Sequence, residues 1–208
     1  MEDVLDLYAE PYDPKRPVVC FDESPKQLVA EVQAPLPATP GQVERYDYEY
    51  KRNGTRNLFL HFEPGRGWRH VAVTESRTMR DFAGQMKWLA DEAHAEADLI
   101  RVVLDNLNTH RPAALYETFP PEEAPRILKR LEFHYTPKHG SWLNMAELEF
   151  SVFDRQCLDR RIGDVATLVQ EVTALEEERN AAHATVAWRF TNEKARKKLH
   201  RLYPSISS

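Results

Sequence analysis

The 208-residue sequence has no hydrophobic run approaching the roughly 20 residues that a membrane-spanning helix requires, which excludes a transmembrane protein. Its acidic start, MEDVLDLYAEPYD, lacks the basic and apolar segments of a signal peptide. Glycine is scarce, with seven residues, and there is no glycine-rich phosphate-binding loop. These absences predict an ordinary globular protein of the cytoplasm.

Cysteine is almost absent as well. The two cysteines, Cys20 and Cys157, both lie in apolar surroundings, which predicts reduced core residues rather than a disulfide. No His and Cys residues have the spacing of a structural zinc site, and no nucleophile elbow supports a serine hydrolase. Other side chains must therefore carry the chemistry.

An excess of positive charge is also missing, because the net charge is −5. This argues mildly against nucleic acid as a partner, yet the basic residues are clustered. Three runs are locally basic: KRNGTR (51–56), RQCLDRR (155–161) and RFTNEKARKKLHR (189–201). One such run usually forms a solvated face, but three on an acidic chain modestly support a surface that binds a polyanion.

The hydrophobic pattern in the first half predicts strands. PVVCF (17–21) is a short β-branched and aromatic run that stops at Asp22. Segments 57–63 and 68–75 are joined by PGRG, which predicts a hairpin, and Asn53-Gly54 indicates a further turn.

The second half alternates between helical and strand patterns. Helical spacing occupies 78–93, where Thr78 and Asp81 form an N-cap pair, and it continues with proline interruptions over 111–130. Further strands are expected at 97–105 and 131–135, and further helices at 144–157 and 164–180. This order predicts an α/β protein with a mixed five-stranded sheet, whose first three strands are antiparallel, and with helices on both faces.

Two carboxylates follow aliphatic strands, Asp22 after 17–21 and Asp105 after Val102-Val103-Leu104. Each residue alone is more simply a turn former or a helix cap. If the two strands are parallel neighbours, however, the carboxylates lie side by side and repel each other. A divalent cation removes that repulsion, and two ions about 3.5–4 Å apart cleave phosphodiesters. The pair therefore favours a metal site.

A third ligand is expected from the helix at 144–157, which carries Glu147 and Glu149. Glu149 lies between two apolar stripes of this helix, and Glu147 lies at the polar border of one of them. Burying Glu149 without a partner would be costly, so it too is a candidate. Periodicity alone does not choose between them.

Three ordered motifs carry a family resemblance: FDES, LDNLNTHRP and FHYTPKHGSWLNMAELEF. Over about 16–160, the sequence resembles the DDE transposase domain of the mariner-like superfamily, with the closest likeness to its bacterial insertion-sequence branch. Matching Leu143-Asn144-Met145-Ala146-Glu147 to that family's Leu-Asn-Pro-Ile-Glu gives Glu147 the glutamate role and makes Glu149 its rival. The chain departs from the pattern in its Met-Ala and in the 41 residues between Asp105 and Glu147.

The resemblance implies a ribonuclease-H-like fold, with a lead-in at 1–15, the catalytic domain at 16–180 and a basic segment at 181–208. It implies Mg²⁺ (or Mn²⁺), expected as two ions held by Asp22, Asp105 and Glu147. The implied reaction is hydrolysis of a phosphodiester at transposon ends, followed by transfer of the freed 3′-hydroxyl into target DNA. Two alternatives stay open: a nuclease that does not join strands, and a DNA-binding remnant without turnover.

The implied partner is DNA, bound at the nucleoid by a homodimer. The family's N-terminal helix-turn-helix region lies outside this chain and would be a separate region or chain. Asn106 and His110 could orient Asp105, a metal-bound water or a phosphate, although capping explains Asn106 nearly as well. Trp142 could stack on a base, although core packing is the commoner role of such a residue. The residues predicted to contact DNA are Lys138, His139, Trp142, Arg196, Lys197 and Lys198.

Overall fold

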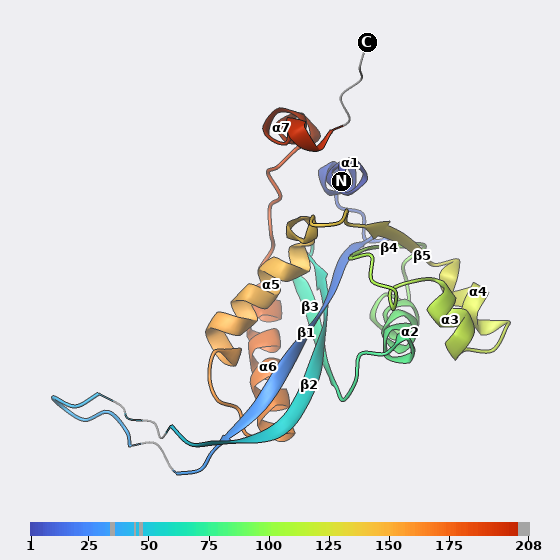
Figure 1. The fold of residues 1–208 in the computed structure, drawn as a ribbon. Coiled ribbons are helices and arrows are strands. Elements are labelled where there is room, and N and C mark those ends of the chain that lie inside the picture. Colours follow the sequence, from blue (N-terminus) through green and yellow to red (C-terminus); the bar gives the residue numbers. More distant parts are fainter. Residues whose placement is uncertain (34–35, 44, 46–47, 204–208) are drawn as a thin grey trace.

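The computed structural model describes residues 1–33, 36–43, 45 and 48–203. Its centre is a five-stranded sheet in the order β3-β2-β1-β4-β5 (Figure 1). The strands are β1 (Val18–Glu31), β2 (Tyr50–Glu63), β3 (Trp68–Thr74), β4 (Ile100–Leu104) and β5 (Leu131–Tyr135). The first three strands pair antiparallel, whereas β4 is parallel to both β1 and β5. The predicted mixed sheet is therefore confirmed.

Helices cover both faces of the sheet, as predicted. One face is packed by α5 and α6, and the opposite face by α2, α3 and α4 (Figure 1). The helices are α1 (Glu2–Ala9), α2 (Met79–Trp88), α3 (Ala113–Thr118), α4 (Glu123–Leu128), α5 (Met145–Phe153), α6 (Val165–Ala181) and α7 (Asn192–Lys198). Single π-helical turns extend α2 (Leu89–Ala93) and α5 (Asp154–Leu158), and short 3-10 turns occupy Ser141–Leu143 and His200–Leu202.

The strand β1 is much longer than the sequence pattern indicated. It pairs with β4 only from Val18 to Cys20, but its ladder with β2 continues to Glu31. The prediction that the strand stops at Asp22 is therefore wrong, because only the parallel partner ends there. Pro25, part of the apparent turn signal, is tolerated because β1 is an edge on the β4 side beyond that point.

Two glycines with a positive φ, one in a turn and one inside a strand, have different roles. Gly67 (φ +71°) lies in the turn between β2 and β3, which confirms the predicted hairpin. A Cβ at this position would lie 2.6 Å from the backbone carbon of His183. Gly54 (φ +93°) lies inside β2, opposite the register shift between Gln27 and Val29. The predicted turn at Asn53-Gly54 is therefore a bulge within a strand, where a positive φ permits the irregularity without reversing the chain.

The core lies in two layers that follow the alternation of the strands. Val19 and Phe21 of β1 pack under α2, whereas Cys20 packs in the layer of α5 and α6. All of β4 is buried because both of its faces are covered, which explains its continuous apolar run. Both cysteines are free and buried, as predicted.

The two ends of the chain also contribute to the α5–α6 layer. Within the expected lead-in at 1–15, α1 buries Val4, Leu5 and Leu7 in this layer. From the basic C-terminal segment, Ala195 of α7 is buried in the same layer. Within the described part of the chain, no helix is both long and apolar enough to cross a membrane.

Candidate active site

The register of β1 and β4 places two of the predicted ligands at the same level of the sheet. Cys20 pairs with Val103, and the last residue of β4 is Leu104. Two residues beyond the pair on each strand are Asp22 and Asp105. Because these strands are parallel neighbours, the two carboxylates emerge together where the pairing ends.

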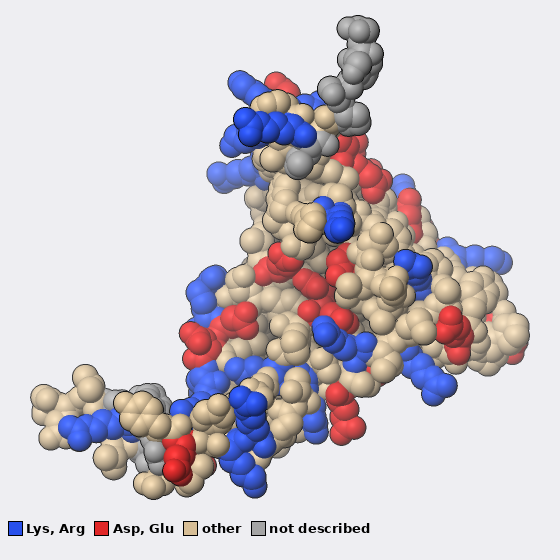
Figure 2. All heavy atoms as spheres, viewed as in Figure 1, with Lys and Arg blue, Asp and Glu red and all other residues tan. Residues whose placement is uncertain are grey.

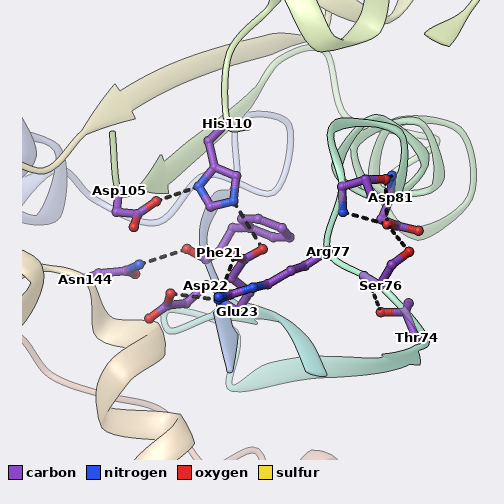
Figure 3. A network of polar contacts seen from close by, with 11 residues as sticks. Phe21, Asp22, Glu23, Thr74, Ser76, Arg77, Asp81, Asp105, His110 and Asn144 are labelled. Atoms are coloured by element: carbon purple, nitrogen blue, oxygen red, sulfur yellow. Dashed lines mark hydrogen bonds and ion pairs between the residues drawn. The ribbon is translucent and has the colours of Figure 1, made fainter. Parts of the chain in front are cut away.

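The helix α5 brings the third candidate to this position. Its N-cap is Asn144, whose Oδ1 accepts a hydrogen bond from the Ala146 amide at 3.2 Å. The Nδ2 of the same side chain donates to the Phe21 carbonyl at 2.8 Å (Figure 3). The first turn of α5, which carries Glu147, is therefore fastened to β1 one residue before Asp22.

The electrostatics of Asp22 show that the three carboxylates influence one another. Burial raises its pKa to about 7, and the negative charges of Asp105 and Glu147 add to this effect. The hydrogen bond from the Glu23 amide to Asp22 Oδ1, 2.8 Å long, and the nearby His110 oppose it. Burial and two neighbouring carboxylates thus outweigh the nearby His110, and a divalent cation bound here would offset the remaining repulsion.

The side chains are not arranged around an ion as they stand. Across the residues that the structure describes, no three His, Cys, Asp or Glu side chains form a group that could hold a metal. The carboxylates of Asp22, Asp105 and Glu147 are therefore close enough to affect one another's charge but are not preassembled ligands.

Glu149 lies in a different environment from Glu147. Its side chain is 1% exposed and forms two hydrogen bonds with Arg179, from Nε to Oε1 at 2.6 Å and from Nη2 to Oε2 at 2.9 Å. The fully buried Arg69 lies 2.9 Å from Oε1 as well. These arginines come from α6 and β3 and bind both carboxylate oxygens. The negative charge of the buried Glu149 is thus balanced by two arginines rather than by a metal ion.

His110 is a fully buried residue at the side of Asp105. Its Nδ1 lies 2.5 Å from Asp105 Oδ1, and its Nε2 lies 3.5 Å from Glu23 Oε2 (Figure 3). The Phe21 and Phe82 rings pack against the imidazole with centroids 5.5 and 4.9 Å away. Burial lowers the pKa of His110, but the contacts with Asp105 and Glu23 outweigh it and raise the pKa to about 9. His110 therefore carries a positive charge at neutral pH and faces Asp105.

From the sequence, Glu23 was considered as a residue supporting Asp22 but was not among the predicted site residues, and Arg77 was not considered. The Glu23 side chain is only 5% exposed, and its Oε1 lies 3.4 Å from Nη1 of Arg77. The only sequence signal for Glu23 was its position directly after Asp22. Nothing local indicated Arg77, because it reaches Glu23 from the connection between β3 and α2.

The loop residues predicted to contact DNA line an open hollow of about 550 Å³ next to Asp105. Asn106, which is exposed, lines this hollow together with Lys138 and His139. His139 has φ +63°, a conformation that few non-glycine residues adopt. The structure therefore brings these three side chains to the Asp105 side of the site.

The remaining predicted contacts lie toward the C-terminal segment. Trp142 is 41% exposed, and its ring packs against Trp188 and Phe190 with centroids 6.4 and 5.5 Å away. Arg196 is held by Glu2 through two hydrogen bonds of 2.7 Å.

Lys197 and Lys198 line a second hollow, of about 500 Å³, together with Arg189, Phe190 and Lys194. Figure 2 shows Lys and Arg side chains gathered over α7, and Asp and Glu side chains near the middle of the same face. Basic side chains also lie beside the acidic ones in the middle and further down the same face (Figure 2).

Comparisons with known proteins bear on the family and the fold of the chain. The family described as DDE superfamily endonuclease matches residues 17–169. No curated protein matches the chain significantly. Among solved structures, the Mos1 transposase paired-end complex with left transposon end has a TM-score of 0.54 at 13% identity, covering 89% of this chain and 60% of that one. The Mos1 mariner paired-end complex with Mn has a TM-score of 0.55 at 14% identity, covering 87% and 55%.

The Mos1 strand transfer complex is similar to the same extent, with a TM-score of 0.54 at 12% identity, covering 88% of this chain and 59% of that one. The chain spans less than two thirds of the length of these neighbours. At such low identity the likeness establishes the fold, which is the predicted ribonuclease-H-like arrangement. The family match covers most of the sequence and confirms the resemblance seen in its motifs: the chain belongs to the DDE superfamily endonuclease family.

Proposed function

We propose that the chain is the catalytic domain of a DNA transposase, which hydrolyses a phosphodiester at each transposon end and transfers the freed 3′-hydroxyl into target DNA. The main support is that Asp105 and Glu147 both act on the pKa of Asp22, although the three lie far apart in the sequence. The family match and the fold shared with transposase–DNA complexes support the same reaction class.

Asp22, Asp105 and Glu147 are the proposed ligands of two Mg²⁺ ions, with Mn²⁺ as a substitute. Carboxylate oxygens are the ligands that these hard cations take. Burial, together with the charges of Asp105 and Glu147, raises the pKa of Asp22, and bound cations would offset that repulsion. When bound, a divalent pair lowers the pKa of a coordinated water and stabilises the leaving oxygen. Glu149 is not proposed as a ligand, since Arg69 and Arg179 neutralise it.

The protein residues around the ligands bind and orient. His110 holds one oxygen of Asp105, and Asn144 holds the start of α5 against β1. Lys138, His139 and Asn106 line the hollow at Asp105, where a DNA strand would pass.

Further along, Lys197 and Lys198 offer phosphate contacts, and the half-exposed Trp142, which packs against Phe190 of the same hollow, offers an apolar surface. Arg196 contributes less than predicted because Glu2 already neutralises it.

The wider assembly is part of the same proposal. The chain would act on paired ends as a homodimer at the bacterial nucleoid, with end recognition supplied by a helix-turn-helix region outside residues 1–208. Support comes from the neighbours that form paired-end complexes and are longer than this chain.

Strand joining is the direct test. Duplexes taken from the DNA flanking the coding sequence, cut to leave a free 3′-hydroxyl, are incubated with plasmid, the protein and Mn²⁺ or Mg²⁺. We expect metal-dependent products in which the duplex is covalently joined to the plasmid. Plasmid nicking without joining would instead identify a nuclease, and DNA binding without either reaction would identify a remnant.

A further inference from the structure

A line of polar contacts leads from the start of α2 to Asp105 (Figure 3). Arg77 lies 3.4 Å from Oε1 of Glu23, and the other oxygen of Glu23 lies 3.5 Å from Nε2 of His110. The Nδ1 of His110 then lies 2.5 Å from Asp105. Each member of this line thus contacts the next, and Glu23 connects the arginine to the histidine.

Glu23 occupies a position where a carboxylate is costly. It is 5% exposed, and it adds a fourth negative charge next to the Asp22, Asp105 and Glu147 group. A buried carboxylate persists only where its partners offset the loss of hydration. The partners of Glu23 are Arg77 on one oxygen and His110 on the other. These two contacts account for a carboxylate at this buried position.

His110 has little freedom to turn. Phe21 and Phe82 pack against its ring, and Tyr135 Oη donates to its backbone carbonyl at 2.9 Å. With Glu23 on the Nε2 side, Nδ1 stays directed at Asp105. A histidine fixed in this way holds one oxygen of Asp105 and leaves the other for a cation.

The outer end of the line is also fixed. Arg77 precedes Thr78, which forms a reciprocal capping box with Asp81 at the start of α2. Ser76 Oγ donates to Asp81 Oδ2 at 2.7 Å, so the residues on both sides of Arg77 are tied to one carboxylate. The guanidinium therefore reaches Glu23 from a rigid turn.

We propose that Glu23 is a positioning residue for Asp105: held by Arg77, it fixes His110, and His110 sets the carboxylate of Asp105 for divalent metal. This rests on the proposed function, in which Asp105 is a metal ligand. Partners that orient a ligand typically change metal affinity by about 10–100-fold when removed. The role of Glu23 is thus visible in metal binding itself, before any reaction with DNA.

The test is Mn²⁺ binding to the purified full chain without DNA, followed by electron paramagnetic resonance. Wild type should bind Mn²⁺ and Asp105→Asn should bind it far more weakly. We expect Glu23→Gln to weaken binding by roughly tenfold. Arg77→Ala should weaken it in the same direction, and Arg77→Lys should restore it. Arg80→Ala removes an exposed cation three residues further along and should leave binding unchanged.

The sign of the Arg77→Ala effect separates positioning from bulk electrostatics. Loss of a nearby positive charge alone would tighten Mn²⁺ binding, whereas loss of the holding contact weakens it. Unchanged or tighter binding by Arg77→Ala, or wild-type affinity in Glu23→Gln, would overturn the positioning role while leaving the proposed metal site intact. A wild-type chain that binds no Mn²⁺ would refute the metal site itself. If Glu23→Gln does not fold, as judged by thermal unfolding, the half-exposed Arg77 variants decide alone.

Discussion

Asn144 and Phe21 are joined by a hydrogen bond of 2.8 Å from a side-chain amide to a backbone carbonyl, between residues 123 positions apart. Through its other atom, the same side chain begins the helix α5. One asparagine therefore sets both where α5 starts and where that start lies relative to β1. Since Glu147 is in the first turn and Asp22 follows Phe21, this contact determines the distance between two proposed ligands.

Asn144→Ala should destabilise the protein by about 2–4 kcal/mol. The lost cap contributes about 1 kcal/mol, and the buried carbonyl of Phe21 loses its partner at a further cost of about 1–3 kcal/mol. Urea denaturation measures the change. Thr78→Ala removes only the cap of α2 and is the matched control, with an expected loss of about 1 kcal/mol. Equal losses in the two variants would show that the link to Phe21 contributes nothing.

Asp105→Asn should reduce metal-dependent DNA cleavage by roughly 10³-fold, since a missing ligand removes several kcal/mol of charge stabilisation. Asparagine keeps the size of the side chain and an oxygen for His110, so the fold and DNA affinity should be retained. Cleavage is followed on a labelled duplex and affinity by fluorescence anisotropy. Full activity in this variant would refute the proposed site.

Glu147→Gln and Glu149→Gln should fail in different ways. Glu147→Gln should lose cleavage and keep its stability, because the side chain makes no buried ion pair in the part of the chain described. Glu149→Gln should lose roughly 3–5 kcal/mol of stability, because Arg69 and Arg179 lose the charge between them. Cleavage and urea denaturation are measured on both variants. A stable, inactive Glu149→Gln variant beside an active Glu147→Gln variant would reverse the assignment.

In the metal-free protein, the contributions of Asp22 and His110 to stability should fall as the pH rises, whereas those of the buried His61 and His94, whose pKa values are lowered, rise with pH below about 6.5. In the folded chain the pKa of Asp22 is about 7 against an ordinary 3.8, so folding favours its protonated form and the free energy of unfolding falls between about pH 4 and 7. The pKa of His110 is about 9 against 6.5, so the stability it contributes is complete below 6.5 and is lost as the pH rises through 9. Both effects have the same sign.

Asp22→Asn removes the first of these two effects. In EDTA at pH 8 this variant should be more stable than wild type by on the order of 2–4 kcal/mol, and the difference should vanish near pH 4. Urea denaturation across this range measures it. Added Mn²⁺ should stabilise wild type at pH 8, because the ion binds only the folded state. A difference between the two chains that does not depend on pH would show that Asp22 is not perturbed.

DNA affinity should fall steeply with salt, because phosphate contacts release counterions. Replacing both Lys197 and Lys198 by alanine should weaken binding and reduce the slope of log affinity against log salt by about 2. Arg196→Ala is the matched control on the same helix and should change the slope by less than one, because Glu2 already binds that guanidinium. A flat salt response in wild type would contradict a phosphate-binding role for α7.

Much of the site could be predicted from the sequence because its signals are local. Asp105 follows a run whose continuous apolar character reflects burial on both faces of β4. The cap at Thr78 was predicted because it bonds an amide only three residues away, and the helices expected from 144 and 164 begin at the caps Asn144 and Asp164, whose bonds are equally local. The motifs around Asp22 and Glu147 carried the family resemblance, which the match over 17–169 confirms.

Partners far apart in the chain could not be predicted in this way. Periodicity placed Glu149 between two apolar stripes but could not show that Arg69 and Arg179 neutralise it. The basic run at 189–201 predicted that Arg196 contacts DNA, but its sequence neighbours could not show that Glu2, at the other end of the chain, binds it.

The sequence by itself determined most of the strands and helices, though not α1 or the length of β1, and which acidic residues are candidates for chemistry. Hydrophobic spacing and helix capping depend on residues that are close in the sequence, so they can be predicted without the tertiary structure. Only the tertiary structure decided that β1 continues past Asp22, that Glu147 rather than Glu149 acts on Asp22, and that Glu23 lies between Arg77 and His110. The physical reason is that a buried charge is defined by its neighbours in space, and these come from distant parts of the chain.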